Sequence, residues 1–260
     1  MKLREIYGKI DAAYPKSMSD GYVAAYGGHD NSGILIDEGR EISGALFSLD
    51  FSQGAIGAAE KAGANLIVTH HPAIFFPVAN LLADDPLGAR LLRAVGAGIG
   101  VISMHLNIDC APGGTDESLA RALGAKGALP PVDKIDGGGY GRVFDIAPQP
   151  FSAFAAGLMR ELDTQRAFIY GEERTISRVA SFCGAGLNGA ALSAAKRGGA
   201  QAVVSADIKH NIICDALESG LNVVQLTHYA SENYGFKKIY QSLKDKLGVP
   251  CFWHEDAGML

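Results

Sequence analysis

The sequence has little cysteine, and no two of its cysteines are closely spaced. Its 260 residues include four cysteines, none of them in a Cys-x-x-Cys motif, which argues against a zinc ribbon or a redox-active pair. The chain starts without a secretory leader, so we expect reduced thiols and a cytoplasmic location. The four are Cys110, Cys183, Cys214 and Cys251.

The sequence also lacks an excess of positive charge and long apolar runs. Its formal net charge is −5, and no dense Lys/Arg cluster provides the basic surface that nucleic-acid binding needs. No run reaches the roughly 18 apolar residues of a membrane-spanning helix. We therefore expect neither a nucleic-acid partner nor a membrane partner.

Short apolar runs alternate with helical patterns along most of the chain. This alternation predicts an α/β fold whose sheets are covered by helices on both faces. Expected strands lie at residues 42–49, 65–69, 100–104, 178–183, 202–205 and 222–227. Expected helices lie at residues 53–62, 86–97, 116–123, 152–162, 189–197, 209–218 and 230–247.

A stretch rich in glycine and proline, residues 126–142, interrupts this alternation. We interpret it as a connection between domains 1–130 and 131–260, with C-terminal residues able to complete the first sheet. The segments 62–71 and 199–207 share a pattern of helix end, buried strand and polar residues. This likeness fits either an internal duplication or the common form of such connections.

Two adjacent histidines, His70 and His71, directly follow the expected strand at residues 65–69. Open α/β sheets place their ligands at the carboxyl ends of strands. Side chains of successive residues diverge where a chain leaves a strand, so the pair could serve two neighbouring metal ions. It could equally be an exposed strand end.

A second polar cluster, His105 and Asp109, follows the expected strand at residues 100–104. Asp109 offers a hard oxygen ligand that complements imidazole, or it caps the next helix. Gly113 to Asp116 form a better cap for that helix, which leaves Asp109 without a structural role. His105 could bind metal or orient a residue that does.

A third cluster, His228 and Glu232, follows the expected strand at residues 222–227. Residues four apart share one helix face, so these two side chains could bind one ion, with the glutamate bridging to another. The alternative is an ordinary helix start.

The three clusters together predict a metal centre with nitrogen and oxygen ligands. Such ligands suit a pair of Zn, Mn, Fe, Co or Ni ions, without distinguishing among them. Ions about 3.5–4 Å apart can activate a water between them. The pattern names no catalytic residue, and Glu232 and His105 are the candidates beside that water.

Other polar residues have less defined roles. Gly184 to Gly186 either cradle an anion or form a tight turn. Asp207 and His210 could line the same cleft, His29 begins a surface turn, and His254 has no assigned role.

Four stretches together resemble the Nif-three-like family, also called the GTP cyclohydrolase I type 2 family and the dinuclear metal centre hexameric proteins. They are Asp30–Gly33 with the later Leu49-Asp50, residues 67–72, residues 105–109 with 113–120, and residues 227–232. The spacing fits the compact form, without a large central insertion. The family often has a tryptophan where this chain has His29, which affects the wall of the pocket.

The resemblance implies a set of metal ligands and an assembly. Two divalent ions per subunit would be held by His70, His71, Asp109, His228 and Glu232, with the glutamate bridging. The implied fold has two related α/β domains, each with a mixed sheet covered by helices, and the implied assembly is a homohexamer.

The leading functional hypothesis is a metal-dependent hydrolase of the GTP cyclohydrolase type that acts through a metal-activated water on a small molecule such as a nucleotide. The alternatives are a metal-dependent phosphoesterase and a non-catalytic protein that binds metal or interacts with partners.

Overall fold

Two mixed β-sheets organise the chain in the computed structural model, which describes residues 1–259. The predicted α/β class with two helix-flanked mixed sheets is therefore confirmed. Met1–Ile108 with Lys238–Asp256 form a first compact unit, and Asp109–Lys237 with the residues from Ala257 form a second. Residue 130, the expected end of the first domain, lies in the second unit.

The first unit contains a five-stranded sheet in the order β1-β4-β3-β2-β11. Four strands run parallel, and β1 is antiparallel to β4. The residues of β2, β3 and β4 are all buried, as expected for parallel strands covered on both faces. The bounds are Gly33–Ile36 for β1, Ala45–Ser48 for β2, Leu66–Thr69 for β3, Gly100–Ser103 for β4 and Cys251–Trp253 for β11.

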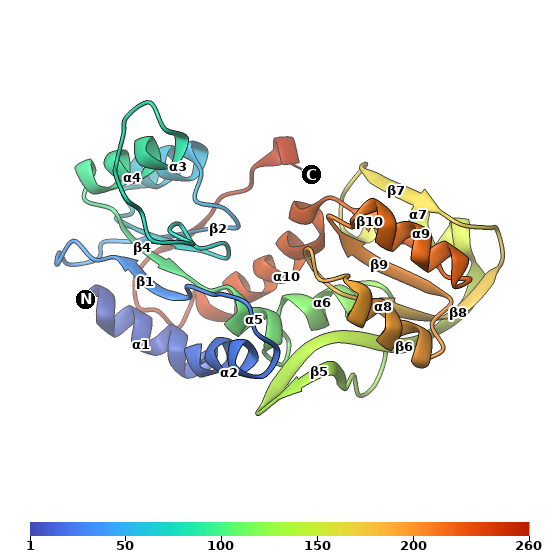
Figure 1. The fold of residues 1–260 in the computed structure, drawn as a ribbon. Helices are drawn as coiled ribbons and strands as arrows, with labels where there is room; N and C mark the ends of the chain where they lie inside the picture. The colour runs from blue at the N-terminus through green and yellow to red at the C-terminus, as the bar shows by residue number, and fades with distance from the viewer. Residues whose placement is uncertain (260) are drawn as a thin grey trace. The chain divides into compact units, whose positions relative to one another are not determined.

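Helices cover both faces of this sheet. Figure 1 shows α3 (Gln53–Ala62) and α4 (Pro86–Gly96) on one face and α1 (Leu3–Ala13) on the other. The sequence fixes both ends of α3, because Ser52 caps its first turn with a 3.0 Å hydrogen bond from the Ala55 amide and Gly63 ends it in a left-handed conformation. A further helix, α2, spans Lys16–Tyr26.

The second unit contains a six-stranded sheet in the order β5-β6-β8-β9-β10-β7. Its strands β8, β9 and β10 are parallel, and β7 is antiparallel to β10. The bounds are Pro131–Ile135 for β5, Gly138–Pro150 for β6, Ala167–Tyr170 for β7, Thr175–Ser181 for β8, Ala202–Ala206 for β9 and Asn222–Leu226 for β10.

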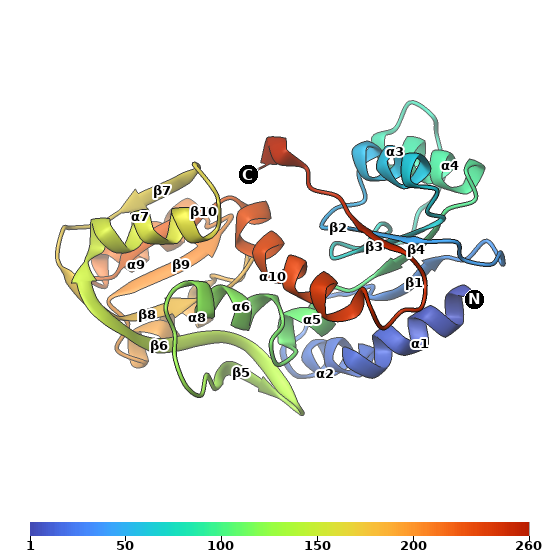
Figure 2. The same ribbon diagram turned by 180° about the vertical axis from the view of Figure 1, so that it is seen from behind.

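Helices also cover both faces of the second sheet. Figures 1 and 2 show α8 (Gly189–Arg197) and α9 (His210–Glu218) on one face and α7 (Phe151–Glu161) on the other. The remaining elements are α5 (Leu106–Cys110), α6 (Thr115–Ala122), α10 (His228–Leu243) and the 3-10 turn η1 (Ala257–Met259). Among residues 1–259, no helix is long and apolar enough to span a membrane.

The interpretation of residues 126–142 as a plain connection is wrong. Most of this stretch forms the hairpin of β5 and β6, in which Ile135 pairs with Gly138. The two residues between them, Asp136 and Gly137, are a strong signal for a two-residue hairpin turn, and Gly137 has a φ of 78°. The glycines therefore mark a turn inside a sheet.

Truncating a core side chain should destabilise the first unit. Ile67 on β3 is fully buried, so Ile67→Ala should lower the free energy of unfolding by about 2–5 kcal/mol. The single tryptophan, Trp253, lies on β11 of the same sheet, so its fluorescence in a urea titration reports on this unit. Leu92→Ala on α4 removes an exposed side chain and should change the value by less than about 0.5 kcal/mol. Equal effects of the two substitutions would contradict this assignment of the core.

Candidate metal centre

Three histidines gather at the carboxyl ends of β3 and β4. The amides of His70 and His71 both donate to the Leu49 carbonyl, at 3.1 and 3.0 Å. The hydroxyl of Thr69 donates to the His71 carbonyl at 2.8 Å, which further fixes the bend after β3. His105 follows β4, the parallel neighbour of β3, so all three histidines lie at one edge of the first sheet.

The three imidazoles, here called the histidine cluster, are close neighbours. Ring centroids are 4.7 Å apart for His70 and His71, 5.1 Å for His70 and His105, and 5.9 Å for His71 and His105. One ring nitrogen from each lies within 4.8 Å of the others. The planes of the His70 and His71 rings are inclined at 47° to each other.

Each ring of the histidine cluster is held through its Nδ1 by an oxygen acceptor. The acceptors are the Met104 carbonyl for His70 at 2.8 Å, Asp50 for His71 at 2.6 Å and Asp30 for His105 at 2.6 Å. Because a carbonyl or carboxylate oxygen accepts, Nδ1 carries the proton. Nε2 is then the nitrogen through which each histidine can bind an ion.

Asp30 anchors the loop that supports His105. Its side chain is 3% exposed and accepts hydrogen bonds from the Ser19 hydroxyl and, at 3.0 Å, from the Ser32 amide. Burial acts to raise the pKa of Asp30, but the hydrogen bonds from His105, Ser19 and Ser32 hold it below its usual range. The carboxyl group is therefore charged at neutral pH. The Ser32 hydroxyl also accepts from the His105 amide at 3.0 Å, so the loop positions both ring and backbone of His105.

The second unit repeats this arrangement with His228. The parallel strands β9 and β10 end at Ala206 and Leu226, so Asp207 and His228 follow at one edge of the sheet. Oδ2 of Asp207 accepts from Nδ1 of His228 at 2.6 Å, which points Nε2 of His228 at Oε2 of Glu232, 3.1 Å away. Asp207 has a φ of 46°, a conformation that aspartate tolerates better than most residues.

Asp109 lies near Glu232 in the same unit. The two residues each present a carboxylate oxygen, and these lie within 4.8 Å of each other. Thr115 donates its hydroxyl proton to Oδ1 of Asp109, and the Cys183 thiol lies 3.7 Å from the same oxygen. Asp109 and Glu232 are each 3% exposed. Asp109, His228 and Glu232 are here called the carboxylate cluster.

A buried ion pair lies beside Asp109. Nη1 of Arg142 is 3.1 Å from Oδ2 of Asp116, and both side chains are almost completely buried. Burial raises the pKa of Asp116 to about 7, against the attraction of Arg142. Burial also raises the pKa of Cys183, and the charge of Asp109 adds to this effect. The thiol therefore stays protonated in the metal-free protein.

The glycines after β8 make room for the carboxylate cluster. Gly184 has a φ of 54°, and a Cβ there would overlap the Glu232 carboxylate and approach Nε2 of His228 to 3.3 Å. A Cβ at Gly186 would overlap the ring of Tyr140. The next helix, α8, begins only at Gly189 after the Asn188 cap. The structure favours the tight-turn interpretation of Gly184 to Gly186 over the anion cradle.

The remaining candidate histidines lie apart from these clusters. His210 lies 3.6 Å from the Cys214 thiol, and His254 lies 3.0 Å from Asp256. His29 is exposed, as expected, and its ring stacks on Phe76 at a centroid distance of 5.0 Å.

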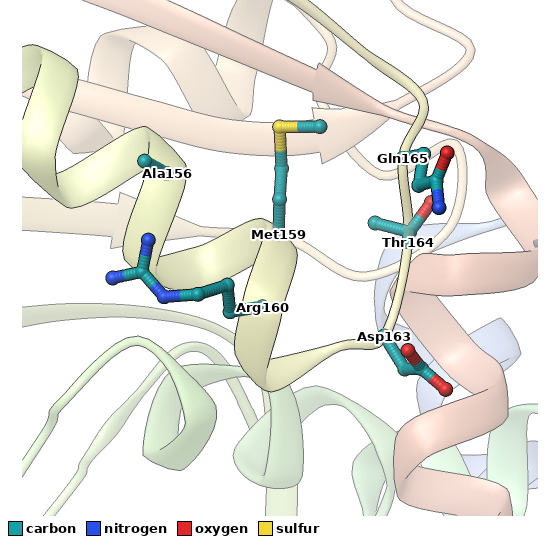
Figure 3. A pocket seen from close by; sticks show the side chains of 6 residues that line it. All are labelled: Ala156, Met159, Arg160, Asp163, Thr164 and Gln165. Atoms are coloured by element: carbon teal, nitrogen blue, oxygen red, sulfur yellow. The ribbon is translucent and has the colours of Figure 1, made fainter.

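A hollow of about 430 Å³ lies beside the C-terminal end of α7. Figure 3 shows its side chains, with the Arg160 guanidinium and the Asp163 carboxylate pointing in different directions. None of the predicted ligands lines it, and its polar groups do not converge. We assign it no function.

The donor sets are chemically suited to divalent metal ions. The histidine cluster offers imidazole nitrogens, and the carboxylate cluster offers one imidazole and two carboxylates. Imidazole and carboxylate ligands suit several first-row divalent ions. Carboxylate or carbonyl acceptors behind metal-binding histidines are typical of such sites. The residues could therefore hold a metal ion.

The sequence is similar to one protein family along nearly its whole length. The sequence model of the Duf34/NIF3 (NGG1p interacting factor 3) family matches residues 1–255. A Clostridium perfringens protein named GTP cyclohydrolase 1 type 2 homolog is 27% identical over 252 residues, which cover 95% of this chain and 93% of that protein. A Nostoc protein of the same name is 31% identical over 219 residues, covering 82% and 80%.

A solved structure shows the same fold. The crystal structure of a Staphylococcus aureus hypothetical protein superposes with a TM-score of 0.85 at 24% identity, and covers 98% of this chain and 96% of that one. At this identity the likeness concerns the fold alone.

The three carboxylates behind the histidines had no predicted function. Asp30 and Asp50 appeared only as parts of motifs, and Asp207 only as a possible lining residue. A signal was present for Asp50 and Asp207, since Asp207 directly follows β9 and Asp50 lies two residues after β2. The histidines stand in the same places, His70 directly after β3 and His228 two residues after β10. Asp30 has no such signal, because it precedes β1 and meets His105 75 positions later.

The role of Asp207 can be tested through the tautomer of His228. Asp207→Asn keeps a side chain that tolerates the positive φ, but its amide accepts more weakly and can also donate. We expect the Nδ1-protonated fraction of His228 to fall, as measured by long-range 1H–15N NMR on chelator-treated protein at alkaline pH. Asp215→Asn, on the exposed side of α9, is the control and should leave His228 unchanged. The same tautomer in all three proteins would rule out a role for Asp207.

Proposed function

The chain belongs to the Duf34/NIF3 family, and we propose that it is a metal-dependent hydrolase in which His70, His71, Asp109, His228 and Glu232 hold two divalent ions. The observation that carries the proposal is the common arrangement of the histidines. His70, His71 and His228 each commit Nδ1 to an oxygen acceptor. Each ring is thereby oriented to bind through Nε2.

The proposed ions would supply an activated water. Paired divalent ions lower the pKa of a coordinated water toward neutrality, which makes hydrolysis possible at neutral pH. The carboxylates of Asp109 and Glu232 balance the positive charge, and their burial keeps them from being screened by solvent.

His105 is the residue we propose to move a proton. It belongs to the histidine cluster but not to the proposed ligands, and it is 20% exposed. Its Nδ1 donates to the charged Asp30 at 2.6 Å. The neutral ring can accept a proton at Nε2 and pass it to the leaving group, and the carboxylate stabilises the imidazolium in between.

The substrate class we propose is a purine nucleotide, with GTP as the first candidate. The support is the name shared by the Clostridium perfringens and Nostoc relatives, GTP cyclohydrolase 1 type 2 homolog. The reaction would add one water to a ring carbon and open the ring to a formamide, and a second water would hydrolyse the formamide and release formate.

Metal content tests the ligand assignment. Protein purified without a histidine tag should contain about two divalent ions per chain by elemental analysis, and His71→Ala and His228→Ala should each contain fewer. The matched controls His210→Ala and His254→Ala should keep the wild-type content, because these histidines lie beside Cys214 and Asp256. Metal-free wild type, or equal losses in ligand and control variants, would refute the proposed centre.

Turnover tests the reaction. Metal-loaded protein should release formate from GTP, and Glu232→Gln should reduce the rate at least 100-fold. His105→Gln should keep its metal and lower kcat by about 10²–10⁴-fold, the usual contribution of acid–base catalysis. A panel of phosphodiesters and other nucleotides run in parallel distinguishes the remaining outcomes. Turnover of a phosphodiester alone would replace cyclohydrolase with phosphoesterase, and bound metal with no turnover would mean a non-catalytic protein.

A further inference from the structure

A cavity of about 350 Å³ opens beside His228, in the second unit. Its volume lies at the lower end of the range for small-molecule sites, about 300–1,000 Å³. The cavity begins at the start of β7 and extends along the carboxyl end of β10. Its lining includes both His228 and the Asp207 that orients it, together with Arg166, Phe168, Gln225 and Met259.

Two lining side chains lie on the same face of the sheet. Phe168 on β7 pairs directly with Gln225 on β10 in the antiparallel register, and directly paired residues project from the same face. Phe168 is 65% exposed, which is unusual for a large aromatic side chain on a strand. The ring and the amide therefore form adjacent parts of one wall of the cavity.

Gln225 has an unused acceptor. Its Oε1 is buried, and no residue of the described chain (1–259) donates a hydrogen bond to it. A buried carbonyl oxygen without a donor costs about 1–3 kcal/mol, so a rotation of the Gln225 amide that turns this oxygen toward the cavity is favourable when a ligand or a water there supplies an N–H or O–H. In a cavity with an exposed aromatic ring, that donor can belong to a flat ligand.

We propose that this cavity binds a heteroaromatic ring that carries an N–H, stacked on Phe168 and donating to Oε1 of Gln225. The assignment rests on the proposed function in one respect, since His228 marks the end at which the ring would react. Arg166 is the cationic residue in the lining, with Nη1 donating to the Gly258 carbonyl at 2.8 Å. It favours a ligand whose ring bears an anionic substituent.

Guanosine is the probe for this site, because its purine carries ring and amino N–H groups. Binding is measured by isothermal titration calorimetry and by saturation-transfer NMR. Phe168→Ala should weaken guanosine binding about 5- to 150-fold, the range for loss of one base–aromatic stack. Ile169→Ala is the matched control, because Ile169 is also exposed but faces the other side of β7 and does not line the cavity. It should bind guanosine as the wild type does.

The hydrogen bond to Gln225 has its own test. Purine riboside keeps the bicyclic ring but has no N–H on it, so it should bind wild type several-fold more weakly than guanosine. Gln225→Leu should bind the two nucleosides equally. A preference for guanosine that survives in Gln225→Leu would overturn the assignment of this contact.

Measuring with and without metal separates this inference from the proposed function. The stack and the hydrogen bond need no ion, so chelator-treated protein should still bind guanosine and lose affinity on Phe168→Ala. Binding that depends on Phe168 in a protein that holds no metal would support the cavity and refute the metal-dependent hydrolase. Absence of guanosine binding, or equal binding by wild type, Phe168→Ala and Ile169→Ala, would overturn the cavity assignment while leaving the metal centre intact. In that case the exposed ring of Phe168 would serve another purpose, such as contact with a second protein.

Discussion

Hydrogen bonds at Nδ1 determine what the histidines of this protein can do. A neutral imidazole has one protonated nitrogen and one with a lone pair, and the acceptor behind the ring selects between them. Here a backbone carbonyl or a carboxylate occupies Nδ1 of His70, His71, His105 and His228. All four rings therefore have the same tautomer, with the proton on Nδ1 and the lone pair on Nε2. In the other tautomer Nε2 would carry the proton and could not bind a cation.

The parallel strands explain why these groups are adjacent. Parallel neighbours end at the same edge of a sheet, so residues from distant parts of the chain meet there without long loops. Asp50 follows β2 and His71 follows β3 in the first sheet, while Asp207 follows β9 and His228 follows β10 in the second. Each pair of acid and histidine thus comes from neighbouring strands, and the rigidity of the sheet limits how far the two can separate.

Much of the fold could be predicted from the sequence where periodicity was strong. The buried strands and α3 and α8 were found nearly at their observed bounds. The edge strands β1, β7 and β11 were missed, because they are short and only partly buried and so lack a continuous apolar run. The hairpin of β5 and β6 was missed because glycine content outweighed the Asp136-Gly137 turn signal.

The ligand candidates could be named from their places after strands. Their acceptors could not, because contacts such as Asp30 with His105 join residues 75 positions apart, and no local pattern records a partner at that separation.

The late position of β11 has a consequence for how the protein is made. This strand, Cys251–Trp253, supplies the only partner of β2 on one side of the first sheet, as the sheet order shows within the described chain. At roughly 5–20 residues per second, a ribosome needs on the order of 10–40 s to travel from β2 to β11. Throughout that interval the edge of β2, with its four buried residues, is open to pairing with another strand. The residues of the second sheet, by contrast, have all been synthesised before β11. The sheet that begins the chain is therefore the last to be completed, and a nascent chain stalled before residue 251 would expose an edge prone to aggregation.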